Sequence, residues 1–208
     1  MLTIIKHPLI ETKLSIMRDE KTSTKDFREL VNEIATMMYY EVYKDLTTHV
    51  SNETYRTPTG SVLNKIEIEE EIIIAPILRA GLGFCDGIKA IMPQVKIGHI
   101  GMYRNEETLQ PVEYYFKMPE AENPLIVIVD PMLATGGSAV AAIDACKKRG
   151  YKNIKLMCLV GVEQGIKAVS SKHPDVHIFL ASQDEKLNDK GYIIPGLGDA
   201  GDRIFGTK

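Results

Sequence analysis

The chain of 208 residues is poor in cysteine and has no excess of basic residues. Its three cysteines, Cys85, Cys146 and Cys158, lie far apart and outside any Cys-x-x-Cys spacing, which indicates buried thiols in a reducing compartment rather than disulfides or zinc ligands. Lys and Arg total 25 against 28 Asp and Glu, and the net charge of -3 supplies no field that would attract a polyanion. A phosphate ligand must therefore be held by local contacts, and no nucleic-acid partner is expected.

Long apolar runs are also missing. No segment approaches the roughly 18 uninterrupted apolar residues of a membrane span, and the apolar run within residues 1–8 is far too short for a signal peptide. We therefore expect a cytoplasmic protein without a membrane partner.

The apolar residues that are present predict a single α/β domain. With 44% hydrophobic residues, a chain of this length can bury a sizeable core. Helical spacing over residues 27–38 follows a helix-start signal at residues 23–26. Runs typical of strands buried on both faces come later, at residues 72–78, 95–102, 125–129, 154–160 and 176–181. Helical spacing between several runs, clearest at residues 139–149, predicts a mostly parallel central sheet flanked by helices.

The segment from Val129 to Ser138 carries the most informative chemistry. A strand delivers Asp130 at its end, and Thr135-Gly136-Gly137-Ser138 opens the next helix with hydroxyls and side-chain-free backbone. Successive backbone N–H groups, two hydroxyls and the positive helix end can then all point at one phosphate dianion. No Gly-Lys-Ser/Thr occurs, and Gly87 comes one position late for a dinucleotide fingerprint after Gly81-Leu82-Gly83. Those two commoner phosphate motifs are thereby excluded.

Strand, acidic residue and Thr-Gly-Gly-Ser together resemble the signature of the type I phosphoribosyltransferases. In the form Asp130-Pro131-Met132-Leu133-Ala134-Thr135-Gly136-Gly137-Ser138, the segment resembles the uracil phosphoribosyltransferase family. Three further blocks are similar to that family and follow in its order, namely residues 77–83, 101–108 and 191–203. The wider superfamily often has two adjacent acidic residues where this chain has Asp130-Pro131, so no role of a second acid is carried over. A Thr-Gly-Gly alone is more often an ordinary helix-opening turn. Four separate blocks in the family's order are not explained by such a turn.

The resemblance implies a reaction and a set of contacts. The reaction is transfer of the phosphoribosyl group of phosphoribosyl pyrophosphate to N1 of uracil, giving UMP and pyrophosphate in pyrimidine salvage. The residues expected to bind phosphoribosyl pyrophosphate are Arg79, Arg104, Asp130, Pro131, Met132, Leu133, Ala134, Thr135, Gly136, Gly137, Ser138 and Asp199. The residues expected to bind uracil, chiefly through the main chain, are Ile193, Gly198, Asp199 and Ala200.

Three residues are expected to act on the reacting atoms. Arg104, together with Arg79, would grip the departing pyrophosphate, because a guanidinium offers paired donors and stays protonated. Asp130 would accept hydrogen bonds from the ribose hydroxyls, although a helix cap is the alternative interpretation. Asp199 would assist loss of the uracil N1 proton or order a water there, and its alternative is an Asx turn.

The same resemblance implies Mg²⁺ as cofactor, GTP as a candidate activator and a homo-oligomer. Mg²⁺ would be held mainly by substrate oxygens and waters, so no protein metal ligand is expected. A zinc site at His173 and His177 is excluded by Pro174 between them and by the lack of other nearby ligand types.

We divide the single domain (1–208) into an N-terminal arm and helix (1–50), a core sheet (71–182) and a base-binding C-terminal hood (183–208). Residues 47–65 indicate a loop or hairpin with no evident function. Polar residues 105–110 and the strand-like run 112–116 predict a mobile hairpin that closes over the substrate and brings Arg104 in.

Three rival functions remain at this point. One is phosphoribosyl transfer to another base, a purine or orotate, from which only the C-terminal block separates uracil. Another is an RNA-binding regulator on the same fold, against which the acidic balance and the lack of an aromatic-interleaved basic stretch stand. The third is a nucleotide-binding module without catalysis.

Overall fold

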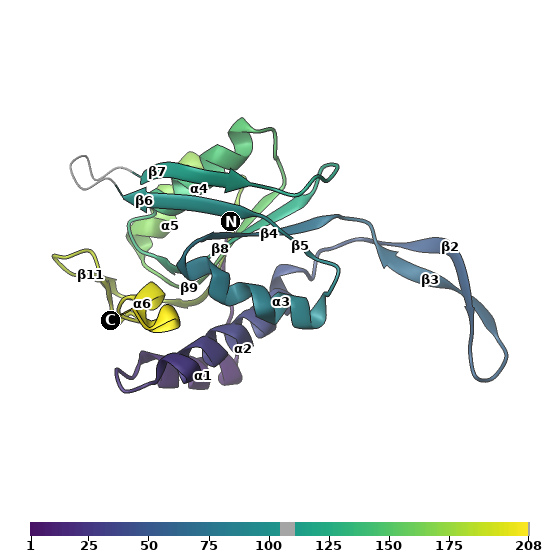
Figure 1. The fold of residues 1–208 in the computed structure, drawn as a ribbon, viewed down its shortest axis with the longest axis horizontal. Coiled ribbons are helices and arrows are strands. Elements are labelled where there is room, and N and C mark those ends of the chain that lie inside the picture. Colours follow the sequence, from purple (N-terminus) through teal and green to yellow (C-terminus); the bar gives the residue numbers. More distant parts are fainter. Residues whose placement is uncertain (105–110, 208) are drawn as a thin grey trace.

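One mostly parallel sheet runs through the computed structural model, which describes residues 1–104 and 111–207 (Figure 1). In that part of the chain the strand order is β1 (Leu2–Ile4), β10 (His177–Gln183), β9 (Ile154–Gly161), β8 (Leu125–Leu133), β4 (Ile72–Leu78), β6 (His99–Arg104) and β7 (Pro111–Lys117). A short strand, β5 (Lys96–Ile97), also pairs with β4. Within this sheet every described pair is parallel except β6 with β7, which confirms the predicted α/β fold.

Helices cover both faces of this sheet (Figure 1). One face carries α1 (Pro8–Arg18), α2 (Thr24–Val42), the 3-10 turn η1 (Ala80–Phe84), α3 (Cys85–Ile91) and α6 (Ala200–Phe205). The other carries α4 (Gly137–Lys148) and α5 (Glu163–Lys172). Successive residues of a strand point to opposite faces, and accordingly Ile74 packs with the first group of helices and Ile73 with the second.

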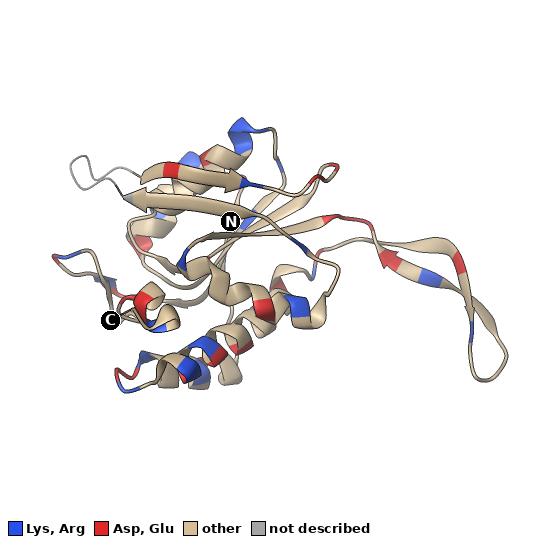
Figure 2. Cartoon of the chain, viewed as in Figure 1, with Lys and Arg blue, Asp and Glu red and all other residues tan. Residues whose placement is uncertain are grey.

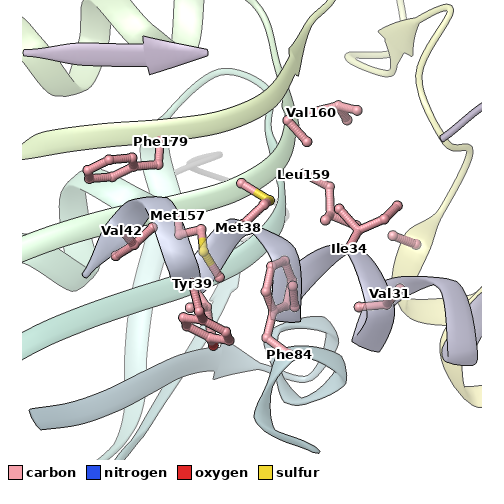
Figure 3. Packing of buried hydrophobic residues seen from close by; sticks show 14 of the residues in the cluster. Val31, Ile34, Met38, Tyr39, Val42, Phe84, Met157, Leu159, Val160 and Phe179 are labelled. Carbon is pink, nitrogen blue, oxygen red and sulfur yellow. The ribbon is translucent and has the colours of Figure 1, made fainter. Parts of the chain in front are cut away.

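Helix α2 provides most of the first core. Ser23 caps its start, since the Asp26 amide donates to the Ser23 hydroxyl at 3.1 Å, which confirms the predicted helix start. Figure 3 shows the apolar stripe of α2 against strands β9 and β10 and against Phe84 of η1. Its labelled residues are Val31, Ile34, Met38, Tyr39, Val42, Phe84, Met157, Leu159, Val160 and Phe179. This packing holds η1, and with it the loop after β4, against the sheet.

Three expectations about the arrangement of the chain need correction. The central sheet extends beyond residues 71–182, because β1 at the N-terminus pairs in parallel with β10, which itself runs to Gln183. The run at 95–102 forms two strands and not one, because the strand is interrupted at Gly98. A Cβ at Gly98 would meet the Met118 sulfur at 2.1 Å. The N-terminal arm also contains α1, which the sequence did not indicate.

Residues 47–65 belong to a hairpin, as one of the two expectations had it. Strands β2 (Thr48–Arg56) and β3 (Val62–Ile68) pair with each other in antiparallel fashion and form an arm that reaches away from the sheet (Figure 1). We call them the β2–β3 arm. A second small hairpin, β11 (Lys186–Leu187) with β12 (Ile193–Ile194), leads into the C-terminal residues.

The strands of the predicted closing hairpin are present as β6 and β7. Arg149 of the α4 C-cap fixes β7, because its guanidinium binds both Glu113 oxygens at 2.6 and 3.0 Å and lies 3.8 Å from the centre of the Phe116 ring. The expected moving part, residues 105–110, lies outside the described residues.

Cys85, Cys146 and Cys158 are free and buried, as expected. Acidic and basic residues are interspersed along α1, α2 and the β2–β3 arm (Figure 2). Within the described ranges, no helix combines the length and the apolar character needed to cross a bilayer.

Candidate active site

The carboxyl ends of neighbouring strands β4, β6 and β8 meet at one edge of the sheet, which is where ligands bind in open α/β sheets. Arg79 follows β4, Arg104 ends β6, and the phosphate-loop residues 130–138 end β8 and begin α4. The structure therefore brings together three of the segments that the sequence singled out.

The phosphate loop is shaped by helix α5. Gly136 has φ +84°, and a Cβ there would meet the Ala168 Cβ at 2.8 Å and the Gly165 carbonyl oxygen at 2.9 Å, both in α5. Gly165 in turn approaches the loop so closely that its own Cβ would lie 2.5 Å from the Ala134 carbonyl oxygen. Two tight contacts thus press the loop onto α5, and only glycine fits at Gly136.

The opposite side of the same loop is open. A Cβ on Gly137 would have a single neighbour within 4 Å, the Thr135 hydroxyl at 3.8 Å. Thr135 and Ser138 are exposed, and α4 begins at Gly137, so the two hydroxyls lie at the end of the helix whose first amides have no partner within it. Pro131 and Leu133 are buried and Met132 and Ala134 half-buried, so these four contribute mainly backbone and packing.

Asp130 sits differently from its expected place at a strand end. Strand β8 continues to Leu133, and Asp130 pairs with Cys158 of β9 inside the ladder. The helix-cap interpretation is wrong, because the N-cap of α4 is Gly136. Asp130 is half-buried, and this burial raises its pKa to about 7, while a hydrogen bond from the Met132 amide acts in the opposite direction. The carboxyl group is therefore poorly solvated and would gain from a ligand that donates hydrogen bonds.

The two arginines lie at the ends of adjacent strands. The Arg79 side chain is 57% exposed and its guanidinium is 3.8 Å from an Asp202 oxygen in α6. It also lies 5.6 Å from the centre of the Phe205 ring, so the loop after β4 faces the C-terminal helix. Arg104 is placed by its backbone, opposite Pro111 of β7, and its side chain lies outside the described part of the structure.

Residues 193–205, a part of the expected hood (183–208), pack on η1 through α6 at this same edge, and the name hood is kept for them from here on. Ile193 and Ala200 are buried and Gly198, with φ +69°, is exposed. Asp199 caps α6, because its Oδ1 accepts a hydrogen bond of 2.9 Å from the Asp202 amide. This is a helix cap and not the Asx turn expected as the alternative, because the bond reaches the amide three residues on, and it uses one carboxylate oxygen of an exposed side chain.

A family model described as uracil phosphoribosyltransferase matches residues 4–207. The chain belongs to this family. Curated members at similar length include a uracil phosphoribosyltransferase of Streptococcus equi subsp. zooepidemicus, 57% identical over 206 residues that cover 99% of this chain and 98% of the relative. Another, from Mycoplasma mobile, is 55% identical over 209 residues and the whole of both chains.

Solved structures share the fold of this chain. The AQ2163 protein from Aquifex aeolicus superposes over 100% of this uracil phosphoribosyltransferase family member and 99% of its own chain, with a TM-score of 0.89 and 40% identity. A hypoxanthine-guanine phosphoribosyltransferase of Bacillus anthracis, with a TM-score of 0.54 and 14% identity over 77% of this chain and 80% of its own, shares the fold. The type I phosphoribosyltransferase fold is thereby confirmed.

The described residues contain no ready-made metal site. Among residues 1–104 and 111–207, no group of three or more His, Cys, Asp or Glu side chains could hold a metal ion. His173 lies 3.2 Å from Asp144, and His177 is hydrogen-bonded to Thr3 at 2.8 Å. The two histidines therefore have separate partners in the fold.

Three polar residues in or beside the hood were given no role from the sequence. Arg18 and Asp184 pair at the ends of α1 and β10, and Arg203 of α6 binds the Leu197 carbonyl. Arg18 ends a helix that the sequence did not indicate, and Asp184 stands in no motif. Arg203 lies within the matching block 191–203, which could have drawn attention to it.

Proposed function

We propose that this protein catalyses transfer of the phosphoribosyl group of phosphoribosyl pyrophosphate to N1 of uracil, giving UMP and pyrophosphate. The observation that carries the proposal is the open glycine loop at residues 135–138, at the start of α4, in a chain that matches the uracil phosphoribosyltransferase family over residues 4–207. Family membership identifies the reaction, and the loop is where its phosphate end is expected to bind.

The 5′-phosphate is assigned to this loop. The first amides of α4 and the hydroxyls of Thr135 and Ser138 donate to its oxygens, and the positive helix end favours its charge. Because Gly137 has no side chain, the space beside it is free for those oxygens. Residues 131–134 bind through their backbone, because their side chains are wholly or partly buried.

Asp130 receives the ribose hydroxyls in this proposal. Two hydroxyl donors stabilise its carboxylate and lower its pKa from the raised value of about 7. The substrate thus favours the ionised form of Asp130, and the negative charge then lies next to a ribose ring that becomes positive as the bond to pyrophosphate breaks.

Arg79 and Arg104 bind the pyrophosphate that leaves. They follow neighbouring strands β4 and β6, so both can reach one group at the sheet edge. Arg79 is only loosely paired with Asp202, at 3.8 Å, and is more than half exposed, which leaves it able to turn toward a stronger anion. A guanidinium there stabilises the negative charge that gathers on the leaving group.

The hood reads uracil, chiefly through its main chain. Ile193, Gly198 and Ala200 offer backbone donors and acceptors beside η1, and the positive φ of Gly198 turns the chain around a small planar ligand. Cytosine presents an amino donor where uracil has an acceptor, which leaves a buried donor unpaired at about 1–3 kcal/mol. Asp199 is assigned to the uracil N1 proton, using the oxygen that does not cap α6.

Mg²⁺ is proposed as the cofactor. The described residues fit an ion held mainly by substrate oxygens and water, since Asp130 is followed by buried Pro131 and no cluster of three ligating side chains occurs among them. When bound, the ion would neutralise charge on the pyrophosphate group.

A homo-oligomer is proposed on the strength of the β2–β3 arm. Val50 and Ile66 stand opposite one another in the arm and are 69% and 72% exposed. An isolated two-stranded ribbon with apolar residues in water is marginally stable, so we infer that a second copy of the chain covers it. Sedimentation should show a dimer or larger species that the double change Val50→Lys, Ile66→Glu converts to monomer.

Activation by GTP and a cytoplasmic location complete the proposal. The free, buried state of all three cysteines is what a reducing compartment favours. GTP activation is tested by measuring the rate of UMP formation with and without GTP at subsaturating phosphoribosyl pyrophosphate.

The decisive experiment on the reaction is a panel of bases. Uracil, cytosine, hypoxanthine, adenine and orotate are each incubated with the protein, phosphoribosyl pyrophosphate and Mg²⁺, and the nucleotide product is measured. The proposal predicts UMP as the main product. A preference for another base, or no release of pyrophosphate with any of them, would overturn it.

A further inference from the structure

Arg18 and Asp184 form a buried ion pair between the end of α1 and the end of β10. The guanidinium binds the carboxylate with two hydrogen bonds, Nη1 to Oδ2 at 2.8 Å and Nη2 to Oδ1 at 2.6 Å. The two side chains are 22% and 1% exposed. Such a two-point pair has a fixed geometry, and breaking it leaves a buried charge without its partner.

The same pair holds both backbone groups of Gly196. Arg18 Nη1 also donates to the Gly196 carbonyl at 2.7 Å, and the Gly196 amide donates to Asp184 Oδ2 at 2.9 Å. Gly196 has φ +64°, and a Cβ there would meet the Ile193 carbonyl oxygen at 2.0 Å. The residue is thus fixed by shape on one side and by two charged groups on the other.

The carboxylate of Asp184 accepts all of its hydrogen bonds from within the protein. Ser182 donates to Oδ1 at 2.9 Å, so each carboxylate oxygen accepts two hydrogen bonds, and all four donors come from the protein. A carboxylate whose oxygens each already accept two hydrogen bonds has little capacity left to bind a ligand. Asp184 therefore acts on the hood and not on a substrate.

Gly196 lies in the middle of the segment assigned to uracil. It follows Ile193 and precedes Gly198 and Ala200, whose main-chain groups read the base in the proposed function. Recognition by backbone requires that the chain be held within about 0.5 Å of the productive geometry. The hood has few regular hydrogen bonds that could do so, since β12 is only two residues long and α6 only six.

We propose that Arg18 and Asp184 are positioning residues that set the affinity for uracil and the selection against cytosine by fixing the main chain at Gly196. The inference rests on the proposed function and adds to it residues that touch neither substrate. It predicts a split between the two substrates, because the phosphate loop is held by β8, α4 and α5 without this pair.

The test compares Asp184→Asn and Arg18→Lys with the intact protein in steady-state assays of UMP formation. Lysine keeps the charge but loses the two-point fork. Losing a charged partner of a buried group is worth at least about tenfold, so the KM for uracil should rise about tenfold or more while the KM for phosphoribosyl pyrophosphate changes less than about twofold. The double variant should be no worse than the poorer single variant, since both changes release the same residue.

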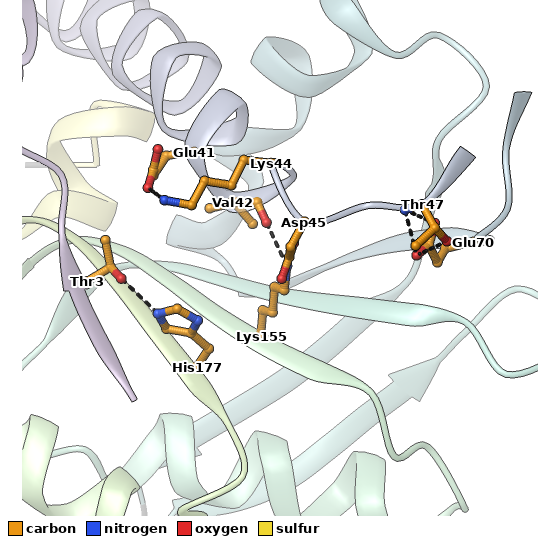
Figure 4. Close-up of polar contacts among 9 residues, drawn as sticks. All are labelled: Thr3, Glu41, Val42, Lys44, Asp45, Thr47, Glu70, Lys155 and His177. Carbon is orange, nitrogen blue, oxygen red and sulfur yellow. Dashed lines mark hydrogen bonds and ion pairs between the residues drawn. The ribbon is translucent and has the colours of Figure 1, made fainter. Parts of the chain in front are cut away.

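A matched control comes from the opposite end of the sheet, at the start of β9. Lys155 is also a buried charge that binds a backbone carbonyl, that of Val42 at 2.7 Å, and a carboxylate, that of Asp45 at 2.5 Å (Figure 4). Lys155→Met should lower the midpoint of thermal unfolding by about as much as Arg18→Lys or Asp184→Asn does. It should leave the KM for uracil within about twofold of the value for the intact protein. If one Arg18 or Asp184 variant fails to fold, the other is measured by the same criteria.

The possible outcomes separate the two proposals. If the intact protein makes no UMP, the proposed function fails. If it makes UMP, and a folded Arg18→Lys or Asp184→Asn variant keeps its KM for uracil and its preference over cytosine, the positioning role is wrong. Equal changes in the KM for both substrates, as expected from general loosening of the fold, would also contradict it.

Discussion

The phosphate loop and the hood lie at the same edge of the sheet but are held in different ways. The loop continues strand β8 into helix α4 and is pressed onto α5 at Gly136 and Gly165. The hood is held by side chains that bind its backbone, with Arg18 on the Gly196 carbonyl and Arg203 on the Leu197 carbonyl. Regular elements therefore shape one half of the site, and a few polar side chains shape the other.

The difference indicates how each half can change. In the loop, the residues that matter are those of the motif and the α5 residues packed against it, because the backbone there follows from close packing. In the hood, residues far away in the chain, such as Arg18, decide where the backbone lies. A site built in these two parts can keep its phosphate contacts while its base contacts are altered, and the following predictions test that division.

The largest effect is expected in the loop half, from Asp130→Asn. Removal of the charge next to the developing oxocarbenium ion should lower kcat by roughly 10²–10³-fold, as for other groups that stabilise transition-state charge. Steady-state rates of UMP formation at saturating substrates measure this. A fall of less than about fivefold would remove Asp130 from the reacting centre.

The same variant should be more stable than the intact protein at high pH. The folded pKa of Asp130, about 7, lies above the ordinary value of 3.8, so the folded state loses stability as the pH rises from about 4 to 7. Asn removes this penalty, and the gain in unfolding free energy should widen by about 2 kcal/mol between pH 5 and pH 8. Urea denaturation without substrate measures it.

Asp175→Asn is the control for that experiment. Its hydrogen bond to Lys147 holds the pKa of Asp175 below the ordinary 3.8, so its contribution to stability is already complete above about pH 4. The effect of Asp175→Asn should therefore be the same at pH 5 and pH 8. A parallel pH dependence in both variants would mean that Asp130 is not the group responsible.

Alanine at the two loop glycines should affect different properties, substrate affinity at Gly137 and stability at Gly136. Gly137→Ala places a methyl group in the open space beside Thr135 and should raise the KM for phosphoribosyl pyrophosphate about tenfold with little loss of stability. Gly136→Ala places a methyl group against α5 and puts a non-glycine residue at a positive φ. Both effects should lower the unfolding free energy, by about 1–3 kcal/mol in all. Thermal melts and substrate titrations of both variants separate these roles; the reverse assignment would contradict the loop geometry.

The smallest effect is expected in the hood half, from Arg203→Lys. Arg203 binds the Leu197 carbonyl at 2.9 Å and the Asp19 carbonyl at 2.6 Å, and lies 4.2 Å from the centre of the Phe27 ring. Lysine can keep one of these bonds, so the KM for uracil should rise about two- to fivefold, the worth of one hydrogen bond. A larger rise for phosphoribosyl pyrophosphate would break the division between the two halves.

Much of the loop half could be predicted from the sequence. Uninterrupted β-branched runs mark strands buried on both faces, and Thr135 to Ser138 follow one of them with the residue types that a phosphate requires. The extent of β8 was the error, because Asp130 to Leu133 include a proline and an acid that break the apolar pattern yet still pair with β9.

The supports of the hood could not be predicted in the same way. Strand β1 is three residues long and pairs with β10 more than 170 residues away, and α1 precedes the first helix-start signal, at residues 23–26. Arg18 and Asp184 meet across the fold at a sequence separation of 166. Pattern and spacing are local signals, and a contact of this kind is fixed only when the sheet has formed.

A crystal structure with UMP bound tests the central claim most directly, because one ligand then spans both halves. The account predicts the 5′-phosphate within hydrogen-bond distance of the amides of Gly137 and Ser138, and the pyrimidine ring on the main chain of Ile193, Gly198 and Ala200. A phosphate bound away from the start of α4, or a ring that makes no contact with the hood, would contradict it.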